Sequence, residues 1–341
     1  MILSTLHVDL GRQWRGGQNQ ALLLAAELRR MGHRAEIVAI SRSPLAGRAR
    51  ALGITVHEVA GRAQAALLLR RLTGFDVVHC HEAHALTAAW LARVNFVVSR
   101  RVAYPVSRLR YSRASRIIAI SQFVKQSVLA RGFADEQVEV IYDGVEIPDE
   151  AAMPGAGAVL GCVAYLLPEK GQELLIRTLP AVLARFPECK LVLAGDGPSR
   201  SDLEKQAADL GVAAAVQFLG LVDDVNAVYR SLDIFVFPSL AEPLGSSLLS
   251  AMAYGLPCVA IASGAVPEVI EHEKNGLLAD KADPVNLAAM IMRLLDDRAL
   301  ATRLGAAARV RIEDRFTVAR MATDTAELYR NACLRTLLRS Q

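Results

Sequence analysis

The sequence is poor in cysteine, and its cysteines are not spaced like metal ligands or a disulfide framework. The five cysteines lie at positions 80, 162, 189, 258 and 333, and four of them sit in or beside apolar runs. We therefore expect buried, reduced thiols in a cytoplasmic protein. The pattern excludes a zinc-binding module and a small disulfide-linked domain.

Long apolar runs are also missing. No stretch approaches the ~20 consecutive apolar residues that a membrane-spanning helix needs. The N-terminal segment from Met1 to Asp9 has no basic flank and only a short apolar run, which favours a first strand over a signal peptide. The chain has 341 residues, 52% of them hydrophobic, so it is long enough for two domains and can bury a sizeable core.

Acidic residues are scarce in the first part of the chain. Residues 1–147 carry 20 Lys and Arg against 11 Asp and Glu, a net charge of +9, whereas the remainder carries −5. The arginines form either a solvated helix face or a contact with an anionic surface, such as phospholipid headgroups or a phosphorylated acceptor. Nucleic acid is not expected as a partner, because no binding motif accompanies them. One stretch without an acid contains Arg100, Arg101, Arg108, Arg110, Arg113 and Arg116.

The chain is rich in short apolar runs that alternate with longer helical patterns. This alternation is typical of parallel sheets covered by helices. The segment 147–157 contains two prolines and two glycines without periodicity, which predicts an interdomain linker. We expect an α/β protein with one doubly wound domain over residues 1–148 and a second over residues 155–317.

The most informative segment follows the predicted buried strand Ile234–Phe237. There Glu242 precedes a turn, Gly245-Ser246-Ser247, that opens an apolar helix. In an open α/β sheet, ligands bind at the carboxyl ends of the strands. A helix start offers free N–H groups and a positive dipole end to a phosphate, and a carboxylate accepts hydrogen bonds from sugar hydroxyls. The segment therefore predicts a site for a ligand with a phosphate end and a polyol end.

This segment resembles the donor-binding signature of glycosyltransferase family 4, the retaining sugar-nucleotide enzymes of GT-B fold. In that family two Glu residues lie eight positions apart and precede Ala-Met-Ala. Here Glu242 matches the first acid, residues 251–253 match the tail, and Ser250 stands in place of the second, ribose-binding Glu. The resemblance implies that Glu242 holds sugar hydroxyls and that Ser250 gives the ribose a weaker, neutral hydrogen bond.

The resemblance extends from Gly16 to about Asp280 and is densest over residues 159–280. It implies the GT-B fold, in which two Rossmann-like, doubly wound parallel-sheet domains face each other across a cleft. The first domain faces the acceptor and the second binds the nucleotide-sugar donor. A C-terminal helix at about 318–341 is expected to pack back onto the first domain.

Other donor contacts follow from the same resemblance. Lys170-Gly171 follows a predicted strand, and a lysine there offsets the charge that builds as a nucleotide leaves; alone, it is also typical of a solvated helix start. Tyr165 replaces the arginine that the family carries five residues before this lysine. The Gly16-Gly17 pair after the first strand matches a loop that lies against the donor phosphates. The remaining donor contacts implied are Gly195, Gly220, Leu221, Leu244, Gly245, Ser246 and Ser247.

The segment His79-Cys80-His81-Glu82 ends another predicted strand. Alternation places His79 and His81 on the same side, which suggests a metal, but a metal site needs further ligands and none is expected here. His81 as a catalytic residue and Glu82 as an acceptor contact are the functional interpretation; satisfied strand-end residues are the alternative. Arg101 stands where many family members place a histidine, and it is either an acceptor contact, together with Arg108 and Arg110, or an ordinary surface residue.

The resemblance implies a retaining hexosyltransferase that moves a sugar from a UDP- or GDP-sugar to a glycan or lipid-linked acceptor. Cell-envelope polysaccharide or lipopolysaccharide synthesis is the expected setting, in the cytoplasm or peripherally on the inner membrane. No Asp-x-Asp occurs, so we expect Lys170 and a helix dipole, rather than a metal or other cofactor, to neutralise the diphosphate. The alternative is a degenerate, non-catalytic member that binds a glycan or a partner enzyme, because Tyr165 and Ser250 both fall on donor contacts.

Overall fold

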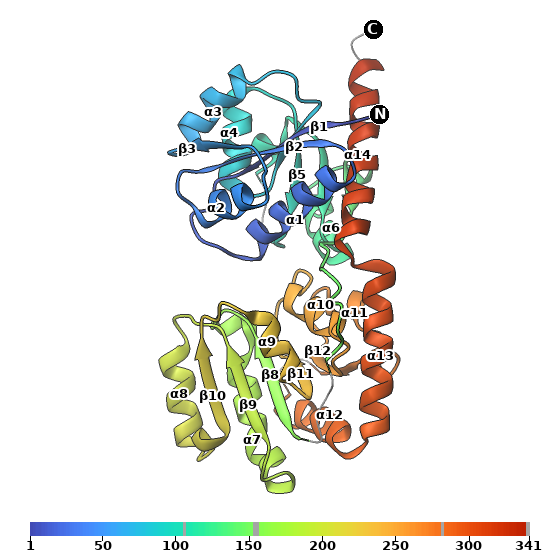
Figure 1. Ribbon diagram of the computed structural model, residues 1–341. Helices are drawn as coiled ribbons and strands as arrows, with labels where there is room; N and C mark the ends of the chain where they lie inside the picture. The colour runs from blue at the N-terminus through green and yellow to red at the C-terminus, as the bar shows by residue number, and fades with distance from the viewer. Residues whose placement is uncertain (105–106, 153–156, 281–282, 339–341) are drawn as a thin grey trace. The chain divides into compact units, whose positions relative to one another are not determined.

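The computed structural model describes residues 1–104, 107–152, 157–280 and 283–338. The chain divides into two compact units (Figure 1): unit 1 comprises Met1–Gly144 with Val318–Gln341, and unit 2 comprises Val145–Thr317. Unit 1 is therefore built from two separate stretches of the chain. Residues 153–156 of the expected linker and 339–341 of the expected last helix lie outside the described residues.

In the described part of unit 1, a seven-stranded parallel sheet has the order β3-β2-β1-β4-β5-β6-β7. The order reverses between β1 and β4, which makes that edge the switch point of the sheet. The strands are β1 (Ser4–Asp9), β2 (Arg34–Ile40), β3 (Val56–Val59), β4 (Val77–Cys80), β5 (Phe96–Arg100), β6 (Ala114–Ala119) and β7 (Val138–Val140). The helices are α1 (Gly16–Arg30), α2 (Pro44–Ala51), α3 (Arg62–Arg71), α4 (Ala83–Ala92), α5 (Arg108–Tyr111), α6 (Gln122–Leu129), the 3₁₀ turn η1 (Asp135–Gln137) and α14 (Val318–Leu338).

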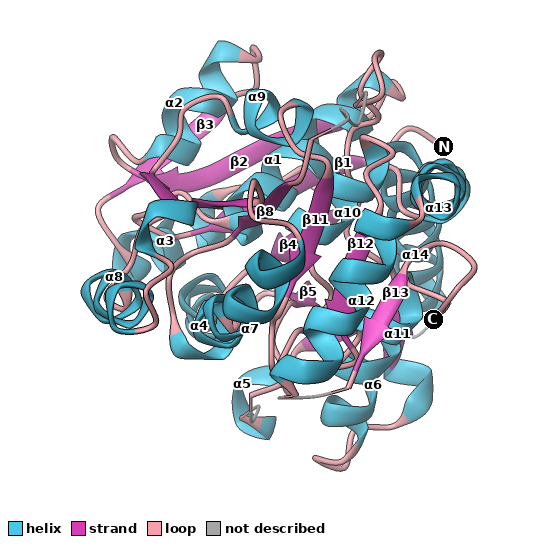
Figure 2. Ribbon diagram, turned by 90° about the horizontal axis from the view of Figure 1, so that it is seen from below, coloured by secondary structure: helices cyan, strands magenta, loops and turns pink. Residues whose placement is uncertain are grey.

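Unit 2 repeats this plan with a six-stranded parallel sheet in its described residues, in the order β10-β9-β8-β11-β12-β13. Its switch point lies between β8 and β11, and helices flank the strands (Figure 2). The strands are β8 (Val159–Val163), β9 (Lys190–Ala194), β10 (Val216–Gly220), β11 (Ile234–Phe237), β12 (Cys258–Ile261) and β13 (Leu277–Ala279). The helices are η2 (Pro168–Lys170), α7 (Gln172–Arg185), α8 (Arg200–Asp209), η3 (Ala213–Ala215), α9 (Val225–Arg230), α10 (Ser246–Ala253), α11 (Val266–Val269), α12 (Pro284–Asp296) and α13 (Arg298–Arg315).

The two sheets differ in how they fill their centres. Strands β11 and β12 of unit 2 are apolar and buried at every position, as expected for parallel strands covered on both faces. Strand β1 of unit 1 instead alternates, with Thr5, His7 and Asp9 all buried on one side of the strand. Tyr329 of α14 is also fully buried. It contacts His79, a neighbour of this polar stripe.

Helix α14 packs against α1 within unit 1 (Figure 1). Leu24 and Leu28 of α1 share a buried apolar cluster with Met321, Ala322 and Tyr329 of α14. Each Å2 of apolar surface that this contact buries stabilises unit 1 by about 25 cal/mol. The last part of the chain therefore completes the core that the first part begins.

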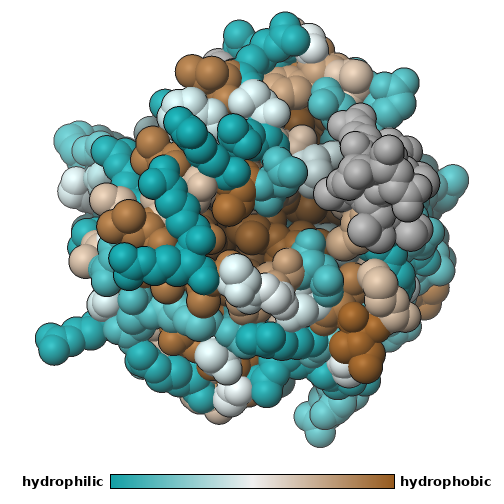
Figure 3. Space-filling model, turned by 90° about the horizontal axis from the view of Figure 1, so that it is seen from above, coloured by the Kyte–Doolittle hydropathy of each residue, from teal (hydrophilic) through white to brown (hydrophobic). Residues whose placement is uncertain are grey.

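None of the helices in the described residues has the length and apolar character needed to cross a lipid bilayer. In the face of the molecule drawn in Figure 3, hydrophilic side chains are spread widely and hydrophobic ones gather near the middle.

Candidate functional site

In unit 2, the loops after β8 and β11 meet at the switch point of the sheet. Lys170 ends the 3₁₀ turn after β8, and Glu242 lies in the loop after β11. The Lys170 Nζ atom lies 2.8 Å from Glu242 Oε2, and the two side chains are 27% and 8% exposed. Ser239 Oγ donates to the same carboxylate oxygen at 2.9 Å. An ammonium has three N–H donors, so Lys170 keeps two for another oxyanion while Glu242 holds its position.

Backbone packing fixes these two loops against each other. The Leu240 N–H donates to the Glu169 carbonyl at 2.9 Å. Gly171 has φ +72°, and a Cβ there would lie 2.0 Å from the Pro238 carbonyl oxygen. Only glycine accepts both the left-handed conformation and this close approach. Lys170 therefore stands on a turn whose position depends on Gly171.

Helix α10 begins beside this pair. Gly245 precedes it with φ +102°, and among the described residues no side chain caps its first turn. Ser246 and Ser247 are half-buried at its start, and Leu244 is buried. Uncapped first-turn N–H groups and the helix dipole favour an anion at this point.

Ser250 lies one turn further along α10, close to Tyr229 of α9. The Tyr229 hydroxyl donates to the Ser247 carbonyl at 3.2 Å. Burial raises the pKa of Tyr229 above its usual value, and a hydrogen bond with the Ser250 hydroxyl opposes that rise. Ser250 is half-buried.

Four more predicted donor residues lie at neighbouring strand ends. The Gly195 N–H donates to the Gly220 carbonyl at 2.8 Å, which joins the ends of β9 and β10. Leu221 is 81% exposed and Tyr165, after β8, is 45% exposed. The sheet order brings the ends of β10, β9, β8 and β11 together in sequence, so these residues and Lys170 border one edge of unit 2.

In unit 1, five predicted site residues line one cavity of about 390 Å3: Gly17, His81, Glu82, Arg101 and Arg110. Their loops follow β1, β4 and β5, which are neighbours in the sheet. Two other predicted residues lie apart from its lining: Gly16 begins α1, and Arg108 is exposed on α5 near Gly132.

Glu82 has a structural task in this loop. Its carboxylate accepts N–H groups from Leu10 at 3.1 Å and from His84 and Ala85 at 2.5 Å each, so it caps the start of α4. This is the alternative in which the strand-end residue is satisfied by its surroundings. Glu82 still lines the cavity.

The arginine-rich stretch is not a solvated helix face, and that alternative is wrong. Arg100 ends β5, Arg108 and Arg110 lie on the four-residue α5, and Arg116 lies within β6. Arg101 is not an ordinary surface residue either: its guanidinium Nε lies 3.0 Å from Asp143 Oδ2, with side chains 13% and 5% exposed. The arginines of this stretch are therefore spread over two strands, a short helix and the connecting loops.

Behind Arg101 runs a chain of buried hydrogen bonds. Arg101 Nη1 lies 3.4 Å from His81 Nδ1, and His81 Nε2 lies 3.0 Å from His7 Nδ1. His7 Nε2 lies 3.1 Å from Thr5 Oγ1, which donates to the Arg34 carbonyl at 3.1 Å. A guanidinium only donates, so each neutral imidazole accepts through Nδ1 and donates through Nε2. The chain therefore has one direction, from Arg101 to the Arg34 carbonyl.

His79 completes the cluster. The β1–β4 register places it beside His7, and its ring nitrogens contact the Tyr329 hydroxyl at 2.5 Å and Ser99 Oγ at 2.8 Å. Burial lowers the pKa of His7 to about 3, and burial lowers the pKa of His79 and His81 well below the usual value, with Arg101 adding to each shift. All three imidazoles are thus neutral near pH 7.

These three histidines form the one group in the described residues whose ligand atoms lie close enough to hold a metal. Each ring nitrogen, however, already has a hydrogen-bond partner, and the group includes no carboxylate. The Arg101 cation lies 3.4 Å from one of the nitrogens. A divalent ion would face this charge in a buried site, so the geometry favours the hydrogen-bond chain.

Sequence reasoning missed the partners that hold the site together. Ser239 lies only three residues before Glu242, whereas Asp143 beside Arg101, and His7 and Tyr329 around the other histidines, come from distant segments. The alternating polar residues of β1 were the available signal for His7, because polar alternation is unusual in a parallel strand buried on both faces.

Comparisons with known proteins identify the family and the fold of the chain. The family model for glycosyl transferases group 1 matches residues 146–311, and the model for glycosyltransferase family 4 matches residues 14–147. An uncharacterized glycosyltransferase of Methanocaldococcus jannaschii is 28% identical over 302 residues, 76% of each chain. A GDP-mannose-dependent alpha-(1-6)-phosphatidylinositol monomannoside mannosyltransferase of Mycobacterium tuberculosis is 38% identical over 157 residues, which cover 43% of this chain and 41% of that protein.

A solved structure of an Anabaena protein with UDP and glucose superposes with a TM-score of 0.86 at 23% identity, covering 96% of this chain and all of that one. The fold is therefore GT-B, as predicted. The chain belongs to the glycosyltransferases of family 4 and group 1.

Proposed function

We propose that the protein is a retaining, metal-independent glycosyltransferase that moves a sugar from a nucleotide-diphosphate sugar to a glycan or lipid-linked acceptor. Unit 2 binds the donor, and unit 1 binds the acceptor. The observation that carries the proposal is the Lys170–Glu242 pair at the switch point, next to the uncapped start of α10. A single site there offers cationic and N–H donors to a diphosphate and a carboxylate to sugar hydroxyls.

In this proposal Lys170 and the first turn of α10 stabilise the charge that develops on the departing diphosphate. Glu242 orients the sugar, and Ser239 and Lys170 hold its carboxylate in place. The acceptor hydroxyl attacks from the face that the nucleotide leaves, through an oxocarbenium-like state, so the anomeric configuration is retained. His81 and Arg101 border the cavity of unit 1 in which we place the acceptor.

The relatives support the donor class and leave the base open. The Mycobacterium relative is named for GDP-mannose, and the Anabaena structure contains UDP. The acceptor in the first name is a phosphatidylinositol mannoside. A role in cell-envelope glycan synthesis at the inner membrane surface remains part of the proposal. The degenerate, non-catalytic alternative is favoured by Tyr165 and Ser250, which depart from the donor pattern.

The test is nucleotide release from a panel of UDP- and GDP-sugars, together with the shift in melting temperature that UDP and GDP cause. We expect one base to raise the melting temperature and its sugar conjugate to turn over. Lys170→Ala should lower turnover about a hundredfold or more, since it removes a charge that stabilises the leaving group.

The matched control is Lys205→Ala, which removes an exposed lysine of the same unit that forms an i,i+4 pair with Asp209. It should leave turnover unchanged. If none of the sugar donors released nucleotide and neither UDP nor GDP shifted the melting temperature, the degenerate alternative would be favoured. Equal losses for the two lysine variants would remove Lys170 from the site.

A further inference from the structure

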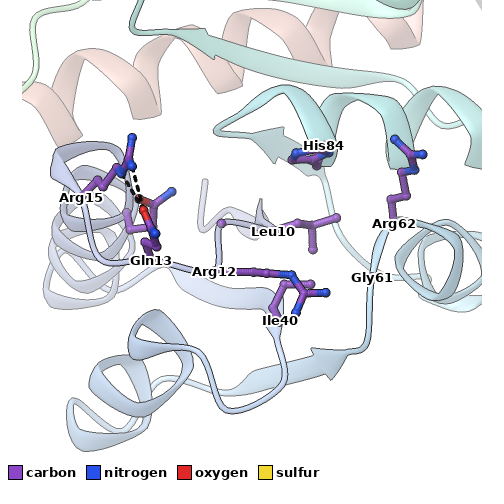
Figure 4. A pocket seen from close by; sticks show the side chains of 10 residues that line it. Leu10, Arg12, Gln13, Arg15, Ile40, Gly61, Arg62 and His84 are labelled. Carbon is purple, nitrogen blue, oxygen red and sulfur yellow. Dashed lines mark hydrogen bonds between the residues drawn. The ribbon is translucent and has the colours of Figure 1, made fainter. Parts of the chain in front are cut away.

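A second cavity of unit 1, of about 610 Å3, has a strongly basic lining (Figure 4). Arg12, Arg15, Arg62 and His84 contribute polar side chains, and no Asp or Glu occurs among the described residues that line it. Its size is within the range of small-molecule sites. This cavity is distinct from the one lined by His81 and Arg101, although both include Arg15.

The sheet order explains why these residues meet. Arg12 follows β1, Arg62 begins α3 after β3, and His84 lies in the first turn of α4 after β4. Strands β3, β2, β1 and β4 are neighbours, so their carboxyl ends lie side by side. Buried Leu10 and Ile40 add an apolar wall between the charged groups (Figure 4).

Two of the guanidinium groups have unused donors. In the part of the chain that the structure describes, Arg12 and Arg62 have neither an ion pair nor a hydrogen bond from the side chain. Arg15 is held by Gln13, to which it donates through two nitrogens at 2.7 and 3.1 Å. Unpaired arginines that line one cavity repel one another, so an anion bound in the cavity would lower this repulsion.

Two carboxylates of this region, Asp9 and Glu82, do not line the cavity. Asp9 is buried and accepts from Gln18 and from the Gly11 N–H. Burial raises the pKa of Asp9 above its usual range. The Glu82 carboxylate accepts the backbone N–H groups of Leu10, His84 and Ala85. Helix α3 adds a positive dipole end, since Gly61 brings no side chain to cap it.

We infer that this cavity binds a phosphate group carried by the acceptor, with Arg12 and Arg62 as its principal ligands. A phosphate carries a charge of about −1.5 to −2 and has terminal oxygens pointing in several directions. It can therefore accept from guanidinium groups on different walls, whereas a planar carboxylate fits one bidentate arginine best. That the ligand is the acceptor rests on the proposed function; that the cavity binds a phosphate ester does not.

The experiment measures binding of sn-glycerol 3-phosphate to the full chain by calorimetry, with L-malate as the carboxylate probe. Arg12→Gln and Arg62→Gln should each weaken binding of the phosphate ester about tenfold or more. Arg71→Gln is the matched control, because Arg71 is exposed in the last turn of the same helix α3. It makes the same change in charge and should alter affinity less than about twofold.

A second arm uses vesicles that contain phosphatidic acid, to separate a lipid headgroup from a soluble ester. Binding in either arm that depends on Arg12 and Arg62 supports the inference and identifies the source of the phosphate. Binding to neither probe, equal losses in the Arg62 and Arg71 variants, or binding of L-malate alone would overturn it.

Lys170→Ala separates this inference from the proposed function. If phosphate-ester binding persists in that variant while the response to nucleotide is lost, the two sites are independent. If nucleotide never binds but the phosphate ester does, the proposed donor site fails and the cavity stands. Loss of phosphate-ester binding in Lys170→Ala, with Arg12→Gln unaffected, would place the phosphate in unit 2 and remove the inference.

Discussion

Unit 2 places one cation, Lys170, on one buried carboxylate, whereas unit 1 lines its cavities with several arginines and packs three neutral histidines, of which His81 lines a cavity, behind one of them. In unit 2 the position of the Lys170 ammonium depends on a backbone turn that needs glycine at position 171. In unit 1 Arg101 is held by the Asp143 carboxylate and also contacts a chain of side chains that crosses β4 and β1. Two sheets of the same topology thus position charge by different means. One means is sensitive to backbone strain, and the other is sensitive to protonation.

The largest difference in stability between the two units is expected when Arg101 is replaced. Arg101→Gln leaves the buried Asp143 carboxylate without its cation, which should lower the free energy of unfolding of unit 1 by about 3–5 kcal/mol. Both tryptophans of the chain, Trp14 and Trp90, lie in unit 1, so their fluorescence during urea unfolding reports on this unit alone. The double variant with Asp143→Asn should recover part of the loss. A double variant as unstable as the single one would mean that the ion pair is not the cause.

Acid should weaken unit 1 through its histidines. Their folded pKa values lie below the unfolded value of about 6.5, so the unfolded chain binds protons that the folded chain does not. Their contribution is present above pH 6.5 and is lost as the pH falls toward the folded pKa, which is about 3 for His7. The three together should lower the free energy of unfolding by about 3 kcal/mol between pH 6.5 and 5.5.

The raised pKa values of Asp9 and Asp143 act in the opposite sense, because they add stability as the pH falls. The quantity to compare is therefore the slope of the free energy of unfolding against pH, and not the free energy at one pH. His7→Gln should reduce the pH dependence of the tryptophan-monitored unfolding by about 1.4 kcal/mol per pH unit at most. An unchanged slope in this variant would show that His7 is already protonated in the folded protein.

Backbone strain should affect unit 2 instead. Gly171→Ala combines a positive φ with a Cβ 2.0 Å from the Pro238 carbonyl oxygen, so we expect a loss of about 1–3 kcal/mol and weaker nucleotide binding. Gly47→Ala is the matched control, because that glycine lies inside α2 and a Cβ added there would meet nothing within 4 Å. It should stabilise unit 1 by about 0.5–1 kcal/mol. Circular dichroism melts and nucleotide titration measure both, and a nucleotide affinity untouched by Gly171→Ala would contradict the role of the turn.

The smallest expected effect tests the departure at position 250. Ser250→Glu adds a charged acceptor beside the start of α10 and should tighten nucleotide binding by about 1 kcal/mol, roughly fivefold. Ser250→Gln has nearly the same size without the charge and should change the affinity less. Calorimetry with the nucleotide that binds measures both. Weaker binding of the Glu variant would mean that Ser250 does not face the ribose.

Much of the fold was predictable because its signals are local. Alternating apolar runs and helical patterns predicted two doubly wound parallel sheets, and this architecture is confirmed. The segment that we propose binds the donor was noticeable for the same reason, since residues 237–253 form one continuous stretch. The sequence also placed Lys170 on the same edge as Glu242, but not the direct ion pair between them, because the two residues are 72 positions apart and the sheet order brings them together.

The basic cavity of unit 1 had no local signal at all. Arg12, Arg62 and His84 come from three different loops, and each alone resembles an ordinary exposed residue. The arginine-rich stretch drew attention to residues 100–116 instead, and three of its arginines, Arg100, Arg101 and Arg110, line the neighbouring cavity. A run of like charges reports composition along the chain, whereas a binding cavity depends on which strand ends are adjacent.

The division of unit 1 into two stretches has a consequence for biosynthesis. Helix α14 is translated only after all of unit 2. Its residues Met321, Ala322 and Tyr329 nevertheless close the core against Leu24 and Leu28, and the Tyr329 hydroxyl contacts His79. On the ribosome, the unit encoded second can reach its native state while the unit encoded first still exposes an unfinished apolar surface. Nascent chains paused before residue 318 should therefore be the form of this protein that most needs a chaperone.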